Sequence, residues 1–111
     1  METSKYNTQI TKMLSEYPKL KVFDSEQDIH IGLLRYNNVP HAAAFIFRFK
    51  DEKVRSFHTV GMRFNIDICF FNKKGELVKK YINCKPGLEN ISSVHPSKYV
   101  VEIKSHNRSG E

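Results

Sequence analysis

The chain has 111 residues, of which 40% are apolar, and its formal net charge is +6. This length fits one domain, and the apolar fraction is sufficient for a hydrophobic core without disulfides or a structural metal. The composition therefore excludes an intrinsically disordered chain. Two cysteines, Cys69 and Cys84, are too few for a disulfide framework.

The first residues lack the basic and apolar regions of a secretory signal, and no apolar stretch approaches the roughly 18 residues of a membrane-spanning helix. We therefore expect a cytoplasmic protein with reduced thiols and no membrane partner. The 18 Lys and Arg residues are scattered as pairs and single residues along the chain. This pattern favours a solvated basic surface over a dedicated basic patch.

The N-terminal segment predicts a helix that Thr3 or Ser4 caps and that Pro18 ends. Its apolar residues recur on one helical face, and they are Tyr6, Ile10, Met13, Leu14 and Tyr17. We interpret residues 1–18 as a helical extension of the domain.

A second, shorter helix is predicted after the apolar run Leu20–Phe23, which suits a strand. Ser25 and Asp28 resemble a capping box at the start of this helix. Its inner side would consist of Ile29, Leu33 and Tyr36, and the helix would end at Asn37-Asn38.

The rest of the chain alternates with a period of two, which is typical of strands. Both faces of the stretch around Ala43–Phe49 are largely apolar, which predicts an interior strand. A strand over 62–71, the turn Asn72–Gly75 and the strand Leu77–Cys84 form a predicted hairpin. With Tyr99–Lys104 as the last strand, the pattern favours a mainly β fold, an antiparallel sandwich or partly closed barrel. We expect a single β-rich domain over 19–104 and a flexible tail over 105–111.

Between residues 20 and 104 the chain resembles the family named domain of unknown function 192. The sequence blocks that carry this resemblance are IGLLR at Ile31–Arg35, AAFIF at Ala43–Phe47, FHTVGMRFNIDICFF at Phe57–Phe71 and PSKYVVEI at Pro96–Ile103. The resemblance implies a compact, mostly antiparallel fold of the jelly-roll type, with the N-terminal helix outside the family's span. It implies no particular reaction. The chain departs from the family at Asn65, where a proline is usual, and at Lys104–His106, where a Pro-Ala-Gly turn is usual.

Asp67 is the most unusual residue, because it interrupts an apolar strand. Two registers of the hairpin place it opposite Lys80 or, if Gly75 forms a bulge, opposite Tyr81. A buried carboxylate without a partner costs several kcal/mol or takes up a proton. Asp67 therefore has one of two roles. It forms a structural ion pair or a hydrogen-bonded tether, or it is the polar anchor of a ligand pocket.

The segment that leads into this strand is loosened by Gly61, and it contains three candidate residues: His58, Thr59 and Met62. A histidine in such a segment can be a general base, a metal ligand or a loop tether. His58 and Asp67, with His41 or His95, would supply the donors of a mononuclear metal site. Their spacing matches no recognised metal motif, so we expect neither a metal nor a cofactor.

Cys84 with His58 or His95 provides a second enzymatic alternative, a Cys–His nucleophile. A catalytic cysteine needs a lowered pKa, and Lys85 is the only nearby cation that the sequence offers. Cys69 fits a core position. We expect no catalytic residue and favour a protein that is not an enzyme.

The predicted hairpin also interleaves basic and aromatic side chains, which is how β surfaces hold single-stranded nucleic acid. The residues concerned are Lys73, Lys74, Lys79, Lys80 and Tyr81. Recognised RNA-binding strand motifs are absent, and lysines on a hairpin also discourage edge aggregation. Nucleic-acid binding is therefore an alternative interpretation.

We favour a non-enzymatic module that binds a small ligand or another protein at the polar face of the strand over 62–71. The predicted site includes His58, Thr59, Met62, Arg63, Asn65 and Asp67. The alternatives are a nucleic-acid-binding protein and a small hydrolase or metal-dependent enzyme.

Overall fold

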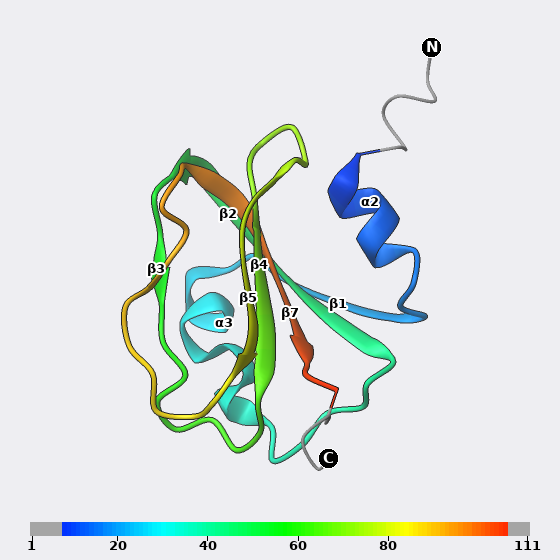
Figure 1. The fold of residues 1–111 in the computed structure, drawn as a ribbon, viewed down its shortest axis with the longest axis vertical. Coiled ribbons are helices and arrows are strands. Elements are labelled where there is room, and N and C mark those ends of the chain that lie inside the picture. Colours follow the sequence, from blue (N-terminus) through cyan, green and yellow to red (C-terminus); the bar gives the residue numbers. More distant parts are fainter. Residues whose placement is uncertain (1–7, 107–111) are drawn as a thin grey trace.

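The structure is a computed structural model and describes residues 8–106. A five-stranded sheet with the order β1-β2-β7-β4-β5 forms its centre (Figure 1). The strands are β1 (Lys19–Phe23), β2 (Ala43–Lys53), β4 (Ile66–Phe71), β5 (Leu77–Cys84) and β7 (Ser97–Lys104). Two short strands, β3 (Ser56–Phe57) and β6 (Ile91–Ser92), form a separate two-stranded sheet.

The prediction of a mainly β fold with two short helices is confirmed. The prediction that the strands are antiparallel is wrong for β1, which pairs with β2 in parallel. Helix α3 (Glu26–Ile31) and the 3₁₀ helix η1 (Gly32–Arg35) connect these two strands. Such a long connection allows a parallel pair, whereas a tight hairpin does not. The result is a mixed sheet.

Both faces of the five-stranded sheet carry a hydrophobic core. On one face α3, η1, β3 and β6 pack against the sheet, and helix α2 (Gln9–Leu14) lies on the other (Figure 1). The first core includes Phe23, Leu33, Phe45, Phe47, Phe64, Ile66, Ile68, Phe70, Ile91 and Val100. The second includes Ala44, Ile46, Cys69, Phe71, Val101 and Ile103. The predicted interior strand, β2, is therefore covered on both faces.

Helix α2 begins after Thr8, whose side chain accepts a hydrogen bond from the backbone N–H of Thr11. The backbone N–H of Ile10 donates to the carbonyl of Gly75 at 3.0 Å, which ties the helix to the β4–β5 turn. Gly75 has φ of 81°, and a Cβ there would lie 2.9 Å from the Ile10 side chain. The predicted caps, Thr3 and Ser4, lie outside the described residues.

Helix α3 begins as predicted, because Ser25 Oγ accepts a hydrogen bond from the backbone N–H of Asp28 at 3.1 Å. It ends earlier than predicted, at Ile31, because Gly32 has a φ of 51°. The chain then continues as η1, which brings Leu33 into the core. Within residues 8–106, no helix is long and apolar enough to cross a membrane.

Candidate functional site

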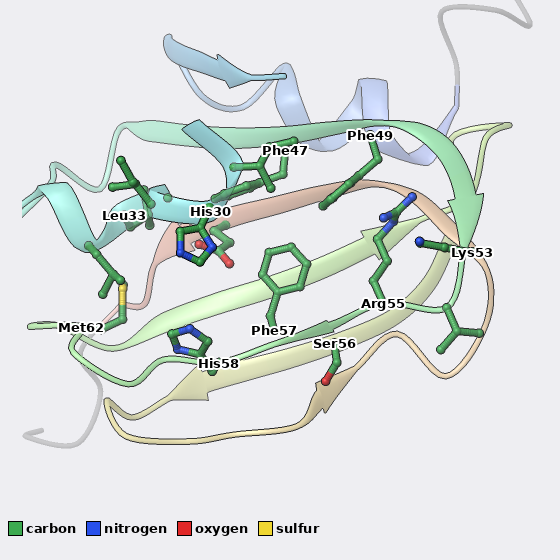
Figure 2. A pocket seen from close by; sticks show the side chains of 16 residues that line it. His30, Leu33, Phe47, Phe49, Lys53, Arg55, Ser56, Phe57, His58 and Met62 are labelled. Atoms are coloured by element: carbon green, nitrogen blue, oxygen red, sulfur yellow. The ribbon is translucent and has the colours of Figure 1, made fainter. Parts of the chain in front are cut away.

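A pocket of about 400 Å³ lies between the five-stranded sheet and the elements that cover its first face (Figure 2). This volume is near the lower end of the range of roughly 300–1,000 Å³ that is usual for small-molecule sites. Segments distant in the sequence converge on it: α3, η1, β2, β3, β7 and the loop that follows β3. The lining residues are Ile29–Leu34, Phe47, Phe49, Lys53–His58, Met62 and Glu102.

Aromatic rings form much of the wall. The ring of Phe57 meets those of Phe47 and Phe49 edge-on, with centroid distances of 5.6 and 6.2 Å. Figure 2 shows Phe57 in the middle of the pocket, with Phe47 and Phe49 across from it on β2. Leu33 from η1 and Met62 from the loop before β4 add aliphatic side chains at one end. Such a wall removes apolar ligand surface from water.

Glu102 is the one carboxyl group among the lining residues, and it comes from β7, the central strand. It pairs with Phe45 on one side and Ile68 on the other, and only 4% of the residue is exposed. Among residues 8–106, no group donates a hydrogen bond to its carboxyl oxygens. Burial raises the pKa of Glu102 to about 8. The carboxyl group is therefore mostly protonated at neutral pH, and it lines the pocket without a partner.

Arg55 is the buried cation of the pocket, and its Nε and Nη2 groups are already bonded within the protein. Its Nε donates to the carbonyl of Ser97 at 3.0 Å, and Nη2 forms an ion pair with Asp51. Its guanidinium lies 3.6 Å from the centroid of the Phe49 ring. The hydrogen bond from Arg55 lowers the pKa of Asp51. The positive charge of Arg55 thus has its counter-charge already.

Histidines stand at the edge of the pocket. Figure 2 shows His30 and His58 at the same end, from α3 and from the loop after β3, respectively. Both are exposed, and His58 Nδ1 accepts a hydrogen bond from the backbone N–H of Val60 at 3.1 Å. Gly32 lets the chain between α3 and η1 approach β2 closely, because a Cβ at this position would lie only 3.2 Å from the Phe47 ring.

The structure separates the residues of the predicted site into three groups. His58 and Met62 line the pocket. Thr59 is fully buried and holds a loop in place: its hydroxyl donates to the Lys85 carbonyl at 2.6 Å and accepts from the Leu88 N–H at 2.9 Å.

Arg63, Asn65 and Asp67 do not reach this pocket. Asp67 points to the opposite face of β4, since its neighbours Ile66 and Ile68 belong to the first core. Asn65 Nδ2 donates to Asn83 Oδ1, and Arg63 Nη1 donates to the carbonyl of Tyr36. A role for these three residues in ligand binding stays a prediction.

Asp67 lies opposite neither Lys80 nor Tyr81, so both predicted registers are wrong at this position. Cys69 pairs with Lys80 and Ile68 with Tyr81, because register shifts occur at both ends of β4. Asp67 Oδ1 accepts hydrogen bonds from the backbone N–H of Asn83 at 2.8 Å and from Ser105 Oγ at 2.6 Å. These contacts are those of a tether that joins β4 to β5 and to the end of β7. Ser105, the first residue of the predicted tail, is buried.

The basic hairpin presents its side chains on two faces rather than one. Lys79 and Tyr81 share a face, with the Lys79 Nζ 5.2 Å from the ring centroid, and Lys80 alternates to the other. The Tyr81 hydroxyl donates to the Ser92 carbonyl, and its ring packs against Phe70. This ring therefore has little free surface for stacking, and nucleic-acid binding stays a prediction.

The residues of the enzymatic alternatives are not brought together. His58 lines the pocket, whereas Asp67 faces the opposite side of the sheet. In the described part of the chain, no three His, Cys, Asp or Glu side chains are placed to hold a metal ion. Burial raises the pKa of Cys84 and raises that of Cys69 to about 11. A cysteine nucleophile needs the opposite shift.

Sequence reasoning missed Glu102 and Arg55 as pocket residues. The signal for Glu102 was present, because it interrupts the apolar run VVEI as Asp67 interrupts NIDICF. No local pattern distinguishes Arg55 from the other basic residues near it.

These features define a small, mainly β protein with a mixed sheet and a pocket lined by aromatic rings and a carboxyl group. A family model for domain of unknown function 192 (DUF192), described as an "Uncharacterized ACR", matches residues 8–108. The chain therefore belongs to this family, as the sequence resemblance indicated. The match begins before α2, so this helix lies within the family's span rather than outside it.

Two solved structures share the fold. A protein of Sinorhizobium meliloti 1021, described as a "putative transcription regulator", has a TM-score of 0.72 at 18% identity, over 78% of this chain and 67% of that one. A protein of unknown function from Novosphingobium aromaticivorans DSM 12444 has a TM-score of 0.72 at 17% identity, over 78% of this chain and 62% of that one. No curated protein matches the sequence.

Proposed function

We propose that this protein is a non-enzymatic binding module that holds a small molecule in the pocket between the sheet and the α3–η1 segment. The observation that carries the proposal is the Glu102 carboxyl group, which is buried in the pocket without a hydrogen-bond partner among residues 8–106. Burial disfavours the ionised form of this group, and that cost appears in its raised pKa. A ligand that bonds to this group would offset that cost.

The character of the walls supports binding rather than catalysis. Aromatic and aliphatic side chains surround a small number of polar groups, which is the usual composition of a ligand site. The thiols of Cys69 and Cys84 are both raised in pKa, which disfavours a thiolate nucleophile. His58 and Met62 belong to this proposed site, and Asp67 belongs to the tether on the other face.

The proposal is tested with three probes that share a phenyl ring and differ in charge: benzyltrimethylammonium, benzyl alcohol and benzoate. We expect at least one of them, at millimolar concentration, to shift the backbone amide signals of Leu33, Arg55 and Phe57 in ¹H–¹⁵N NMR spectra. The signals of Leu14 and Leu77, on the other face of the sheet, should not move. If no probe shifts the pocket signals selectively, the proposal is wrong.

A matched pair of variants locates the binding. Met62→Trp narrows the pocket, whereas Met13→Trp places the same bulk on the opposite face of the sheet. We expect Met62→Trp to weaken probe binding about tenfold, which corresponds to a loss of about 1.4 kcal/mol of contact energy. Met13→Trp should leave the affinity unchanged. Equal affinities for both variants would place the probe elsewhere.

A further inference from the structure

We propose that the natural ligand of this pocket is a small organic cation, an alkyl- or arylammonium compound whose charge lies against Glu102 and the rings of Phe47 and Phe57. This inference rests on the proposed function and identifies the chemical class of the ligand. It follows from three features of the pocket: the Glu102 carboxyl group has no counter-charge within residues 8–106, aromatic faces line the wall, and the buried cation Arg55 is already paired with Asp51.

The missing counter-charge is the first feature. Glu102 is 4% exposed and lies on the central strand, where Phe45 and Ile68 flank it. Within the described residues, the structure contains no ion pair for it. A cation that lies close to a carboxyl group favours its ionised form. A ligand cation in the pocket would supply that charge.

The aromatic wall is the second feature. The face of an aromatic ring carries partial negative charge and attracts cations within roughly 6 Å of its centre. The Phe49 ring already has the guanidinium of Arg55 3.6 Å from its centroid. Phe47 and Phe57, with centroids 5.6 Å apart, are the remaining rings of the pocket wall. The aliphatic side chains of Leu33 and Met62 line the same pocket.

The state of the basic groups is the third feature, and it disfavours an anionic ligand. Arg55 is paired with Asp51, and the side chain of Lys53 is 65% exposed, with its Nζ 3.9 Å from the same carboxylate. The other basic groups that face the pocket are the exposed His30 and His58. An anion would therefore approach Glu102 without gaining a buried cation that is free to pair with it.

Binding of a cation would release a proton from the pocket. Because the pKa of Glu102 is about 8 in the free protein, about nine tenths of the carboxyl groups are protonated at pH 7. A cation binds the ionised form, so its affinity should rise about tenfold between pH 7 and pH 9. The other charged or titratable side chains that line the same pocket are His30, Lys53, Arg55 and His58.

The test compares the three probes with benzyl or phenyl rings by NMR and isothermal titration calorimetry. We expect benzyltrimethylammonium, whose charge does not titrate, to bind at least tenfold more tightly than benzyl alcohol at pH 9, and benzoate to bind most weakly. At pH 7, calorimetry in phosphate and in Tris buffer should reveal the release of about 0.9 proton for each bound cation.

Two variants separate the role of Glu102 from general electrostatics. Glu102→Gln should abolish both the proton release and the pH dependence, whereas Glu76→Gln removes a carboxylate in the β4–β5 turn and should change neither. If benzyl alcohol or benzoate binds the pocket as tightly as the cation, or if no proton is released, the cation proposal is wrong while the binding site stands. If no probe reaches the pocket, the proposed function itself is wrong. The proton-release measurement needs only the unmodified protein, so it decides the question even if Glu102→Gln does not fold.

Discussion

Asp67 and Glu102 are two carboxyl groups on adjacent, antiparallel strands of one sheet, and their surroundings differ completely. Each interrupts an apolar strand, β4 or β7, and Asp67 pairs with Ile103 while Ile68 pairs with Glu102. Asp67 accepts two hydrogen bonds, whereas Glu102 accepts none from residues 8–106. Because adjacent residues of a strand face opposite sides, a shift of one position separates a structural tether from a pocket group.

The largest expected effect of this difference is on the pH dependence of stability. The pKa of Glu102 is raised from 4.5 to about 8 in the folded protein, so the folded state retains a proton that the unfolded chain loses. The contribution to stability is complete below pH 4.5 and is lost as the pH rises toward 8, at up to about 1.4 kcal/mol per pH unit. Urea unfolding of the unmodified protein and Glu102→Gln between pH 5 and pH 9 measures this difference. An identical pH profile for both proteins would show that Glu102 is not protonated by burial.

Replacement of Glu102 by an apolar residue should stabilise the protein. Glu102→Leu removes the unpartnered carboxyl group from the core face of β7, and we expect the free energy of unfolding at pH 8 to rise by about 1–3 kcal/mol. Chemical denaturation measures this change. A decrease in stability would indicate that the carboxyl group has a bonding partner in the native protein.

Loss of the Asp67 tether should lower the stability of the protein, by somewhat less than Glu102→Leu raises it. Asp67→Ala leaves the Asn83 N–H and the Ser105 hydroxyl without their acceptor, so we expect the free energy of unfolding to fall by about 1–2 kcal/mol. Ser105→Ala removes one of the two bonds and should cost about half as much. If Asp67→Ala leaves stability unchanged and weakens probe binding instead, the predicted ligand site on this face gains support.

Local features of the fold were predictable from the sequence. The Ser25 cap of α3, the Asn72–Gly75 turn and the alternating faces of β4 depend on neighbouring residues, and the structure shows all of them. Strand pairing was not predictable in the same way. The parallel position of β1 beside β2 and the order of the sheet depend on contacts between distant segments.

The candidate site was predictable only in part, for a physical reason. The sequence grouped His58 and Met62 with Asp67 in one site, whereas the structure places His58 and Met62 in the pocket and Asp67 on the other face of the sheet. Whether an acidic residue in an apolar strand has hydrogen-bond donors depends on the register of the neighbouring strands, and register shifts at both ends of β4 changed that register. The same sequence signal at Glu102 therefore gave no means of distinguishing a pocket carboxyl from a tether.

The position of β7 has a consequence for how the chain assembles. Among the strands within residues 8–106, β7 comes last in chain order, yet it lies between β2 and β4 and joins the two halves of the sheet (Figure 1). Synthesis proceeds from the N-terminus, so the segments that form β1, β2, β4 and β5 are synthesised before β7, the strand that pairs with both β2 and β4. During that interval the hydrophobic edges of β2 and β4 are unpaired and open to association with other chains. Arrival of the 8 residues of β7 closes both edges at once and also brings Glu102 to its pocket.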